Sequence, residues 1–290
     1  MKESWQSTPV PARIRYSRDD ERDIEDFCHT VLAFYAKNRR DLPWRRTTDP
    51  YCILVSEIML QQTQVDRVTR KYPLFLEAFP DFSTLANAPL ADVLSVWQGM
   101  GYNRRAIALR ECAVRICSDF AGNLPCSVEM LATLPGIGHA TASSICVYAF
   151  NEPLVFIETN IRRVFIHHFF DEQEVVADSE ILPIVRQALS GKDSRTWYNA
   201  LMDYGTELKK TVPNPNRRSR HYTRQAAFEG SDRKIRGRIL KILLERQRMT
   251  RKEIHTFLAE DTRRVDQLID SLVEEGFISQ SGRFLQIASR

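Results

Sequence analysis

The chain has 290 residues, of which 43% are hydrophobic and 27% are charged, a composition typical of a globular protein large enough for two cores. Its formal net charge of +4 is too small to indicate a nucleic-acid partner without a local concentration of charge. The sequence has no secretory signal and no run of about twenty apolar residues, so we expect a soluble cytoplasmic protein without a membrane anchor.

Residues 1–20 are polar and contain two prolines, which predicts an extended N-terminal segment. Apolar residues with helical spacing begin near Asp23, and similar spacing recurs along the chain. The further predicted helices cover residues 51–60, 64–78, 90–98, 103–120, 127–133, 139–150, 160–169, 178–190 and 195–210. The alternating pattern of a strand is absent between residues 21 and 208, so we expect an all-helical domain there.

Residues 233–290 predict a second, smaller domain. Three amphipathic segments begin near Arg233, Thr250 and Asp261, and two short apolar runs then flank a turn at Gly282. Three helices followed by a β-hairpin are typical of a winged helix-turn-helix, whose third helix reads or rests on DNA. Such domains also contact proteins, so the sequence leaves open whether this one binds DNA or a repair protein.

The segment Leu134–Pro135–Gly136–Ile137–Gly138 lies between two predicted helices and is followed by His139. Glycines at 136 and 138 permit a positive φ and a close approach of the backbone to a ligand. The second helix begins with outward N–H groups and the positive end of its dipole, which favours an anion such as a nucleic-acid phosphate. A tight helix–helix turn would use the same residues, so this segment alone leaves both interpretations open.

Five segments occur in the order and approximate spacing of a known family. They are Leu42–Arg45, Ser56–Val65, Trp97–Tyr102, Leu134–Ala142 and Glu158–Val164. From about residue 25 to residue 205 the chain resembles the helix-hairpin-helix DNA glycosylases, and most closely the branch that removes adenine from A/G mismatches. The resemblance implies a mainly α, two-lobed glycosylase domain with a cleft between its lobes, which we place at residues 21–208, and double-stranded DNA as the partner of what we expect to be a monomer.

A glycosylase that acts on duplex DNA must flip the target nucleotide out of the stack, and side chains then fill the gap. The resemblance assigns this wedge to Gln61, Gln62 and Tyr102, whose ring has a flat face for stacking on a base. It also implies that the hairpin residues bind a backbone phosphate. These residues are Leu134, Gly136, Ile137, Gly138 and His139.

Residues 209–232 form a basic linker between the two predicted domains. From Lys209 to Arg224 it contains six Lys or Arg residues, one His and no acid, and its prolines predict an irregular conformation. A charge run is usually a solvated surface. Beside a DNA-binding domain, however, we expect Arg217, Arg218 and Arg220 to contact phosphates.

Two carboxylates carry the predicted chemistry. A purine base leaves most easily when it is protonated, which near neutral pH requires an acid whose pKa is raised by apolar surroundings; Glu57 has such neighbours and matches the family's acid. The sugar then carries positive charge, and the family stabilises or traps it with an Asp. This chain has Glu158 there, and a carboxylate displaced by about 1 Å lowers the rate on the order of 100-fold unless the pocket compensates. Asn160 matches the amide that orients this carboxylate.

Two features of the sequence limit the chemistry. Family members that also cut the DNA backbone carry a lysine where this chain has Ala140, so we expect a monofunctional enzyme without AP lyase activity. Most adenine-specific members hold an iron–sulfur cluster with four cysteines beyond the position of Tyr204. The six cysteines of this chain all lie at or before Cys146, so we expect no cluster, no other cofactor and no metal.

We therefore expect a mainly α, monofunctional DNA glycosylase of base excision repair that flips and hydrolytically removes a mispaired or modified base, adenine or another purine, from nucleoid DNA. The alternative is a catalytically weakened protein that binds DNA mismatches or damage, a hypothesis that the Glu at 158 motivates. A transcription regulator built on the winged helix would explain only the last sixty or so residues.

Overall fold

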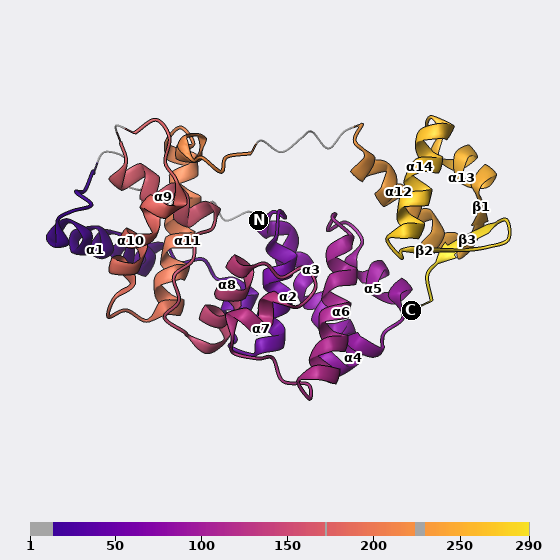
Figure 1. Cartoon of the computed structure of the whole chain (residues 1–290), viewed down its shortest axis with the longest axis horizontal. Coiled ribbons are helices and arrows are strands. Elements are labelled where there is room, and N and C mark those ends of the chain that lie inside the picture. The colour runs from indigo at the N-terminus through magenta and orange to yellow at the C-terminus, as the bar shows by residue number, and fades with distance from the viewer. Residues whose placement is uncertain (1–13, 172, 224–229, 290) are drawn as a thin grey trace. The chain divides into compact units, whose positions relative to one another are not determined.

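The computed structural model describes residues 14–171, 173–223 and 230–289, and these residues are mainly helical (Figure 1). The mainly α fold predicted from the sequence is thereby confirmed. Most of the predicted extended N-terminal segment, residues 1–13, lies outside the described residues. None of the described helices has the combination of length and hydropathy that crossing a membrane requires.

The chain divides into two compact units. Unit 1 comprises the chain up to Pro50 together with Cys126–Ala132 and Gly138–Arg224, and unit 2 comprises Tyr51–Pro125, Thr133–Ile137 and the chain from Gln225 onward. Each unit therefore combines segments far apart in the sequence. The segment of residues 128–150, two helices joined by the loop with Gly136 and Gly138, crosses the boundary twice, because most of the loop belongs to unit 2 and the two helices belong to unit 1.

Unit 1 is built around the pair α9 and α11. Phe27, Phe165, Trp197 and Tyr204 are fully buried in its core. Gly205 allows the two helices to approach closely, because a Cβ at this position would lie 2.7 Å from the backbone oxygen of Asn160. The elements are α1 (Glu21–Asn38), η1 (Pro43–Arg45), α7 (Val128–Ala132), α8 (His139–Phe150), α9 (Thr159–Phe169), α10 (Asp178–Leu189), α11 (Ser194–Thr211) and η2 (Pro215–Arg218).

The first part of unit 2 contains five helices within residues 50–119. Trp97, Phe75 and Leu85 are fully buried in its core. These elements are α2 (Pro50–Leu60), α3 (Val65–Ala78), α4 (Phe82–Asn87), α5 (Leu90–Trp97) and α6 (Arg104–Asp119). The sequence prediction missed α4, because six residues are too few to show a helical repeat, although Asp81 caps this helix by accepting a hydrogen bond from the Thr84 N–H.

The C-terminal part of unit 2 has the three predicted helices and the predicted hairpin. Its helices are α12 (Asp232–Arg246), α13 (Arg251–Leu258) and α14 (Thr262–Glu274), and its strands are β1 (Arg248–Thr250), β2 (Ile278–Ser281) and β3 (Phe284–Ile287). The sheet order is β1-β3-β2 and both pairings are antiparallel, with Leu285 opposite Met249 and Gln280. The sequence prediction missed β1, since a strand of three residues shows no alternation.

Candidate active site and nucleic-acid interface

The loop between α7 and α8 uses its two glycines differently. Gly136 has φ +73°, and a Cβ there would lie only 2.9 Å from the Cβ of Ala108. Gly138 has φ −85°, and apart from its neighbours along the chain no described residue has an atom within 4 Å of a Cβ built at this position. The positive φ that the sequence suggested for both glycines therefore occurs only at Gly136.

Side chains of unit 2 hold this loop by its carbonyl groups. The Cys112 thiol donates to the Pro135 oxygen at 3.0 Å, Arg115 Nη1 to the Thr133 oxygen at 2.6 Å and Gln61 Nε2 to the Gly136 oxygen at 3.3 Å. Burial raises the pKa of the Cys112 thiol to about 12, so it stays protonated and remains a donor. The loop is thus fixed from the protein side.

The start of α8 has the properties of an anion site. Its N-cap is Gly138, which has no side chain to accept the N–H groups of the first turn. His139 is exposed beside it, whereas the side chains of Leu134 and Ile137 are buried. Leu134 and Ile137 can therefore offer a ligand only their backbone groups, while the positive end of the helix dipole favours a phosphate here.

The predicted wedge residues have unusual backbone conformations. Gln62 has φ +53° and Tyr102 has φ +49°, in the left-handed region that residues other than glycine rarely adopt. Gly99 and Gly101, beside Tyr102, also have positive φ. Backbone strain of this kind persists only where surrounding contacts enforce it, and it is concentrated at functional sites.

Arg105 enforces these conformations, and the sequence analysis did not identify it. Its guanidinium donates to the backbone oxygens of Ile58 at 2.8 Å, Gln61 at 2.6 Å and Gly101 at 3.1 Å. It also lies over the Tyr102 ring, 5.5 Å from the centroid. Burial lowers the pKa of Arg105 to about 10, which leaves it charged at neutral pH. One side chain thus connects the end of α2 to the two wedge loops, residues 61–64 and 98–103, which carry Gln62 and Tyr102.

Glu57 lies near the C-terminal end of α2. It is the one charged residue in the sequence of α2, and its neighbours Val55, Ser56 and Ile58 are fully buried. Glu57 itself is half-buried. Glu57 thus stands among residues that are uncharged and mostly buried along this helix.

Glu158 is the N-cap residue of α9. Its Oε1 accepts hydrogen bonds from the backbone N–H groups of Asn160 at 2.5 Å and Ile161 at 2.9 Å. Burial raises the pKa of Glu158, while these two N–H groups and the charge of Arg163 oppose that rise. The structure therefore places a carboxylate at the positive end of a helix, held by its own chain.

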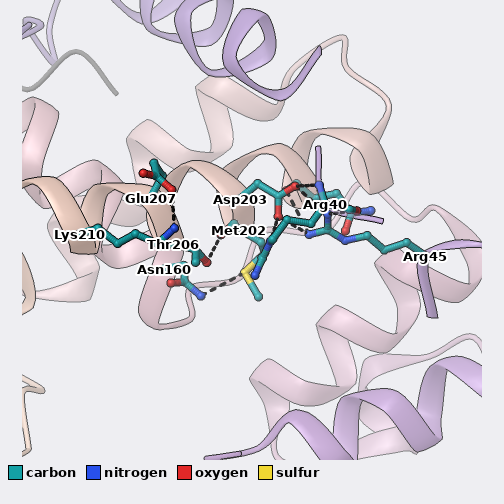
Figure 2. A network of polar contacts seen from close by, with 9 residues as sticks. Arg40, Arg45, Asn160, Met202, Asp203, Thr206, Glu207 and Lys210 are labelled. Atoms are coloured by element: carbon teal, nitrogen blue, oxygen red, sulfur yellow. Dashed lines mark hydrogen bonds and ion pairs between the residues drawn. The ribbon is translucent and has the colours of Figure 1, made fainter. Parts of the chain in front are cut away.

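Asn160 lies beside this carboxylate, as the sequence predicts. Its Nδ2 is 3.5 Å from Glu158 Oε2, and its Oδ1 accepts from Arg163 Nη1 at 2.6 Å. Figure 2 shows the contact of the same Nδ2 with Met202 Sδ, at 3.7 Å. Arg163 also donates to the Gly205 oxygen at 2.8 Å, which fixes it between α9 and α11. The orientation of the Asn160 amide is therefore set by the protein.

Leu42–Arg45 is the first of the five segments that carry the family resemblance, and the structure shows how Arg45 is held. Asp203 on α11 is buried and accepts two hydrogen bonds of 2.8 Å from Arg45, one on each oxygen, and one of 2.5 Å from Arg40 Nε (Figure 2). Such paired guanidinium–carboxylate contacts fix geometry as well as charge. They anchor the chain before α2 beside Met202, which touches Asn160.

The three arginines predicted to bind phosphates differ in their surroundings. Arg217 and Arg220 are exposed, whereas Arg218 is half-buried. The Arg218 guanidinium donates to the backbone oxygens of Phe170, Asp171, Gln173 and Ile166, so its contacts indicate a structural role. The segment contains no cysteine, because the sequence has none after Cys146.

The structure groups the candidate residues within its two units. Unit 2 contains Glu57 and the wedge residues, and unit 1 contains Glu158 and Asn160. Ala140 is exposed at the second position of α8. Among the described residues, no three His, Cys, Asp or Glu side chains are placed to hold a metal ion.

Comparison with known proteins identifies the class. The family model described as HhH-GPD superfamily base excision DNA repair protein matches residues 55–182. A solved structure of a thermostable thymine-DNA glycosylase aligns with a TM-score of 0.56 and 26% identity, over 63% of this chain and 85% of that one. The fold and the hairpin thus define a base excision repair protein of the helix-hairpin-helix type.

Two relatives of known function identify the branch of the superfamily. The adenine DNA glycosylase of Mycolicibacterium smegmatis is 34% identical over 275 residues, which cover 88% of this chain and 94% of that protein. The adenine DNA glycosylase of Mycobacterium tuberculosis is 32% identical over 286 residues, covering 88% and 91%. The chain belongs to the HhH-GPD superfamily, in its branch of adenine DNA glycosylases, a family of DNA glycosylases of base excision repair.

Proposed function

We propose that the protein is a monofunctional DNA glycosylase that removes a flipped purine, with adenine as the first candidate. The observation that carries this proposal is Glu57, a half-buried carboxyl group on a helix whose other residues are uncharged and mostly buried. The similarity to two mycobacterial adenine DNA glycosylases over most of the chain supports adenine as the base.

In the proposed reaction, protonated Glu57 donates its proton to the base as the bond between the base and the sugar breaks. The bonding electrons leave with the base, which departs neutral, and the sugar becomes a cation. Glu158 stabilises this cation electrostatically, and Asn160 keeps the carboxylate in position. Water then adds to the sugar carbon and loses a proton, which leaves an abasic site.

The residue at position 140 supports a reaction that stops at the abasic site. A lyase needs an amine that can form a Schiff base with the sugar, and the methyl group of Ala140 cannot do so. We infer that the backbone of the product strand stays intact until alkali or another enzyme cleaves it. No metal or cluster takes part in this scheme.

In this proposal DNA is bound by the start of α8, by the wedge side chains and by exposed arginines. The start of α8, around Gly138 and His139, would bind one phosphate. Gln61, Gln62 and Tyr102 would fill the gap left by the flipped nucleotide. We keep Arg217 and Arg220 as phosphate contacts and assign Arg218 to the support of η2, because its donors already reach backbone oxygens.

The first experiment is single-turnover incubation of the purified protein with duplexes containing A:G, A:8-oxoguanine, T:G, U:G or hypoxanthine, followed by alkali. Strand breaks that need alkali, with an adenine duplex responding most, are the expected result. Breaks without alkali would contradict the absence of lyase activity. A response confined to a pyrimidine duplex would overturn the assignment of the base.

Glu57→Gln tests the acid directly. The amide has the same shape but no proton to donate, so we expect excision to fall by at least 10²-fold, within the range of general-acid catalysis, while DNA affinity changes only a few-fold. If this variant excises the base at the wild-type rate, Glu57 is not the acid.

The cap made by Glu158 is the observation that favours a second function, a mismatch- or damage-binding protein with weakened catalysis. Its Oε1 is occupied by two backbone N–H groups, and the family has a shorter carboxylate here. Tight binding to one duplex without excision, together with excision gained by Glu158→Asp, would establish that function.

A further inference from the structure

Within unit 2, α12 of the C-terminal domain packs against α5 and faces the wedge loops. Between them lies a groove of about 1150 Å³. One wall consists of residues 61–64 and 98–105, which include the wedge, and the other wall is one face of α12. The groove therefore begins at the side chains that would enter a DNA duplex.

Both walls of the groove are basic. The wedge wall contributes Arg104 and Arg105, with Arg67 beside them, and α12 contributes five Lys or Arg residues; the one acidic residue in the lining is Glu275. The Glu275 carboxylate forms ion pairs with Arg104 at 2.9 Å and with Arg236 at 2.7 Å. Like charges on facing walls repel, so the arrangement is most favourable when a polyanion lies between them.

The wedge aromatic is in direct contact with α12. The Arg233 guanidinium lies 5.3 Å from the centroid of the Tyr102 ring and donates to its hydroxyl. A phosphate that attracts Arg233 would uncover the ring for stacking on a base. Occupancy of the groove and action of the wedge are in this way linked through one side chain.

The third helix, which reads DNA in many winged helix domains, lacks these properties here. Its sequence has three acidic and two basic residues, and two of these charges pair within the domain: Arg264 with Asp232 at 2.7 Å, and Asp270 with Arg251 at 2.5 Å. The sequence of α12, by contrast, has six Lys or Arg residues against two acids. Arg236, Arg238 and Lys241 also form ion pairs, so the contrast between the two helices lies in their net charge and in the place of α12 on the groove.

We propose that α12, and not α14, is the DNA-contacting helix of the C-terminal domain, and that the groove holds the sugar-phosphate backbone of the strand next to the wedge. This inference rests on the proposed action on DNA. The domain then adds phosphate contacts beside the wedge and contributes no base reading through its third helix.

The test uses the full-length protein and an undamaged duplex of about 20 base pairs, long enough for several phosphate contacts. The groove variant is Lys234→Gln/Lys241→Gln, and the controls are Arg246→Gln, an exposed residue of α12 outside the groove, and Arg263→Gln on α14. We expect the groove variant to reduce the slope of log Kd against log salt by about 2, and neither single-charge control to give the reduction of about 1 that one lost phosphate contact would cause.

An unchanged slope in the groove variant would overturn the inference, as would a reduction of about 1 with Arg263→Gln, which is the full effect of one lost phosphate contact. Thermal unfolding shows whether each variant is folded, and the single variant Lys241→Gln, at a 61% exposed side chain, repeats the test with a smaller change. Because binding to undamaged DNA needs no excision, a protein that binds through α12 but removes no base would refute the proposed function while leaving this inference intact.

Discussion

At the scale of single residues, we expect Gly136 to be required for stability and Gly138 for DNA binding. Gly136→Ala places a Cβ 2.9 Å from Ala108 and forces alanine to a positive φ, so we expect a loss of at least about 1–2 kcal/mol in the free energy of unfolding. Gly138→Ala meets no atom of the described residues and should leave stability within about 0.5 kcal/mol of wild type.

DNA affinity should show the reverse order. Gly138→Ala should weaken DNA binding more than Gly136→Ala does, because the new methyl group at 138 would occupy the side from which a phosphate approaches. Urea unfolding and a DNA titration of both variants check this pair of expectations. Wild-type affinity in a folded Gly138→Ala protein would argue that the loop is a plain helix–helix turn.

Glu158 makes a prediction about pH. Its pKa is raised in the folded state, so its favourable contribution to stability is complete below the unfolded pKa of about 4.5 and is lost as the pH rises through the folded value. Glu158→Gln keeps an oxygen for the two N–H groups of α9 and removes the buried charge. We therefore expect the variant to unfold at a higher temperature than wild type at pH 7.5, while excision is lost.

The wild-type excision rate should rise with pH on its acid side, because only the ionised Glu158 can stabilise the sugar cation, and the midpoint should lie above the usual range for a glutamate. A pH series of single-turnover rates measures it. An excision-competent Glu158→Gln variant would remove this residue from the mechanism.

At the scale of elements, Arg105 holds the end of α2 and the two wedge loops in one arrangement. A lysine keeps the charge but cannot reach several oxygens at once. We expect Arg105→Lys to lower the free energy of unfolding by about 2 kcal/mol and to lower the excision rate more than the affinity for DNA, since the wedge loses its conformation. Arg104→Lys, at a neighbouring and largely exposed side chain, is the matched control.

Equal effects of the Arg104 and Arg105 substitutions on excision would mean that both act through their charge alone. The comparison is informative because the two side chains are adjacent in sequence and differ chiefly in their contacts. Arg105 donates to backbone oxygens of both loops, whereas Arg104 pairs with Glu275.

At the scale of the whole molecule, we expect stability at acid pH to depend on a buried histidine of unit 1. The neutral ring of His168 joins three segments: its Nδ1 donates to the Ile14 oxygen at 2.8 Å, and its Nε2 accepts from the Tyr204 hydroxyl at 2.9 Å. Burial lowers the pKa of His168 to about 3. Its contribution is thus complete above about pH 6.5 and is lost as the pH falls toward 3.

We expect this group to lower the free energy of unfolding by about 2 kcal/mol between pH 7 and pH 5, because each unit of pH below the unfolded pKa corresponds to about 1.4 kcal/mol. Urea unfolding at the two pH values measures the loss. His168→Gln should reduce the difference, and His29→Gln, at an exposed residue of α1, should retain it. Equal pH dependence in both variants would assign acid sensitivity to other groups.

The sequence by itself determined the fold class, the family and the candidate chemistry. Glu57, Glu158 and the hairpin are defined by short stretches of chain whose residue types are dictated by local chemistry, such as a carboxyl group among apolar neighbours or a glycine at a tight turn. The amine missing at Ala140 and the absence of cysteine beyond Cys146 are covalent facts that no folding can alter.

Only the tertiary structure distinguished residues that look alike in sequence. Contacts with residues that are in most cases dozens of positions away along the chain distinguish Arg105 from Arg104 and Arg218 from Arg217. They also distinguish the basic face of α12, which lines the groove, from the net acidic α14. A charged side chain has the same local pattern whether it is solvated, bonded to carbonyl groups or facing a groove. Its role is decided by what the folded chain brings against it.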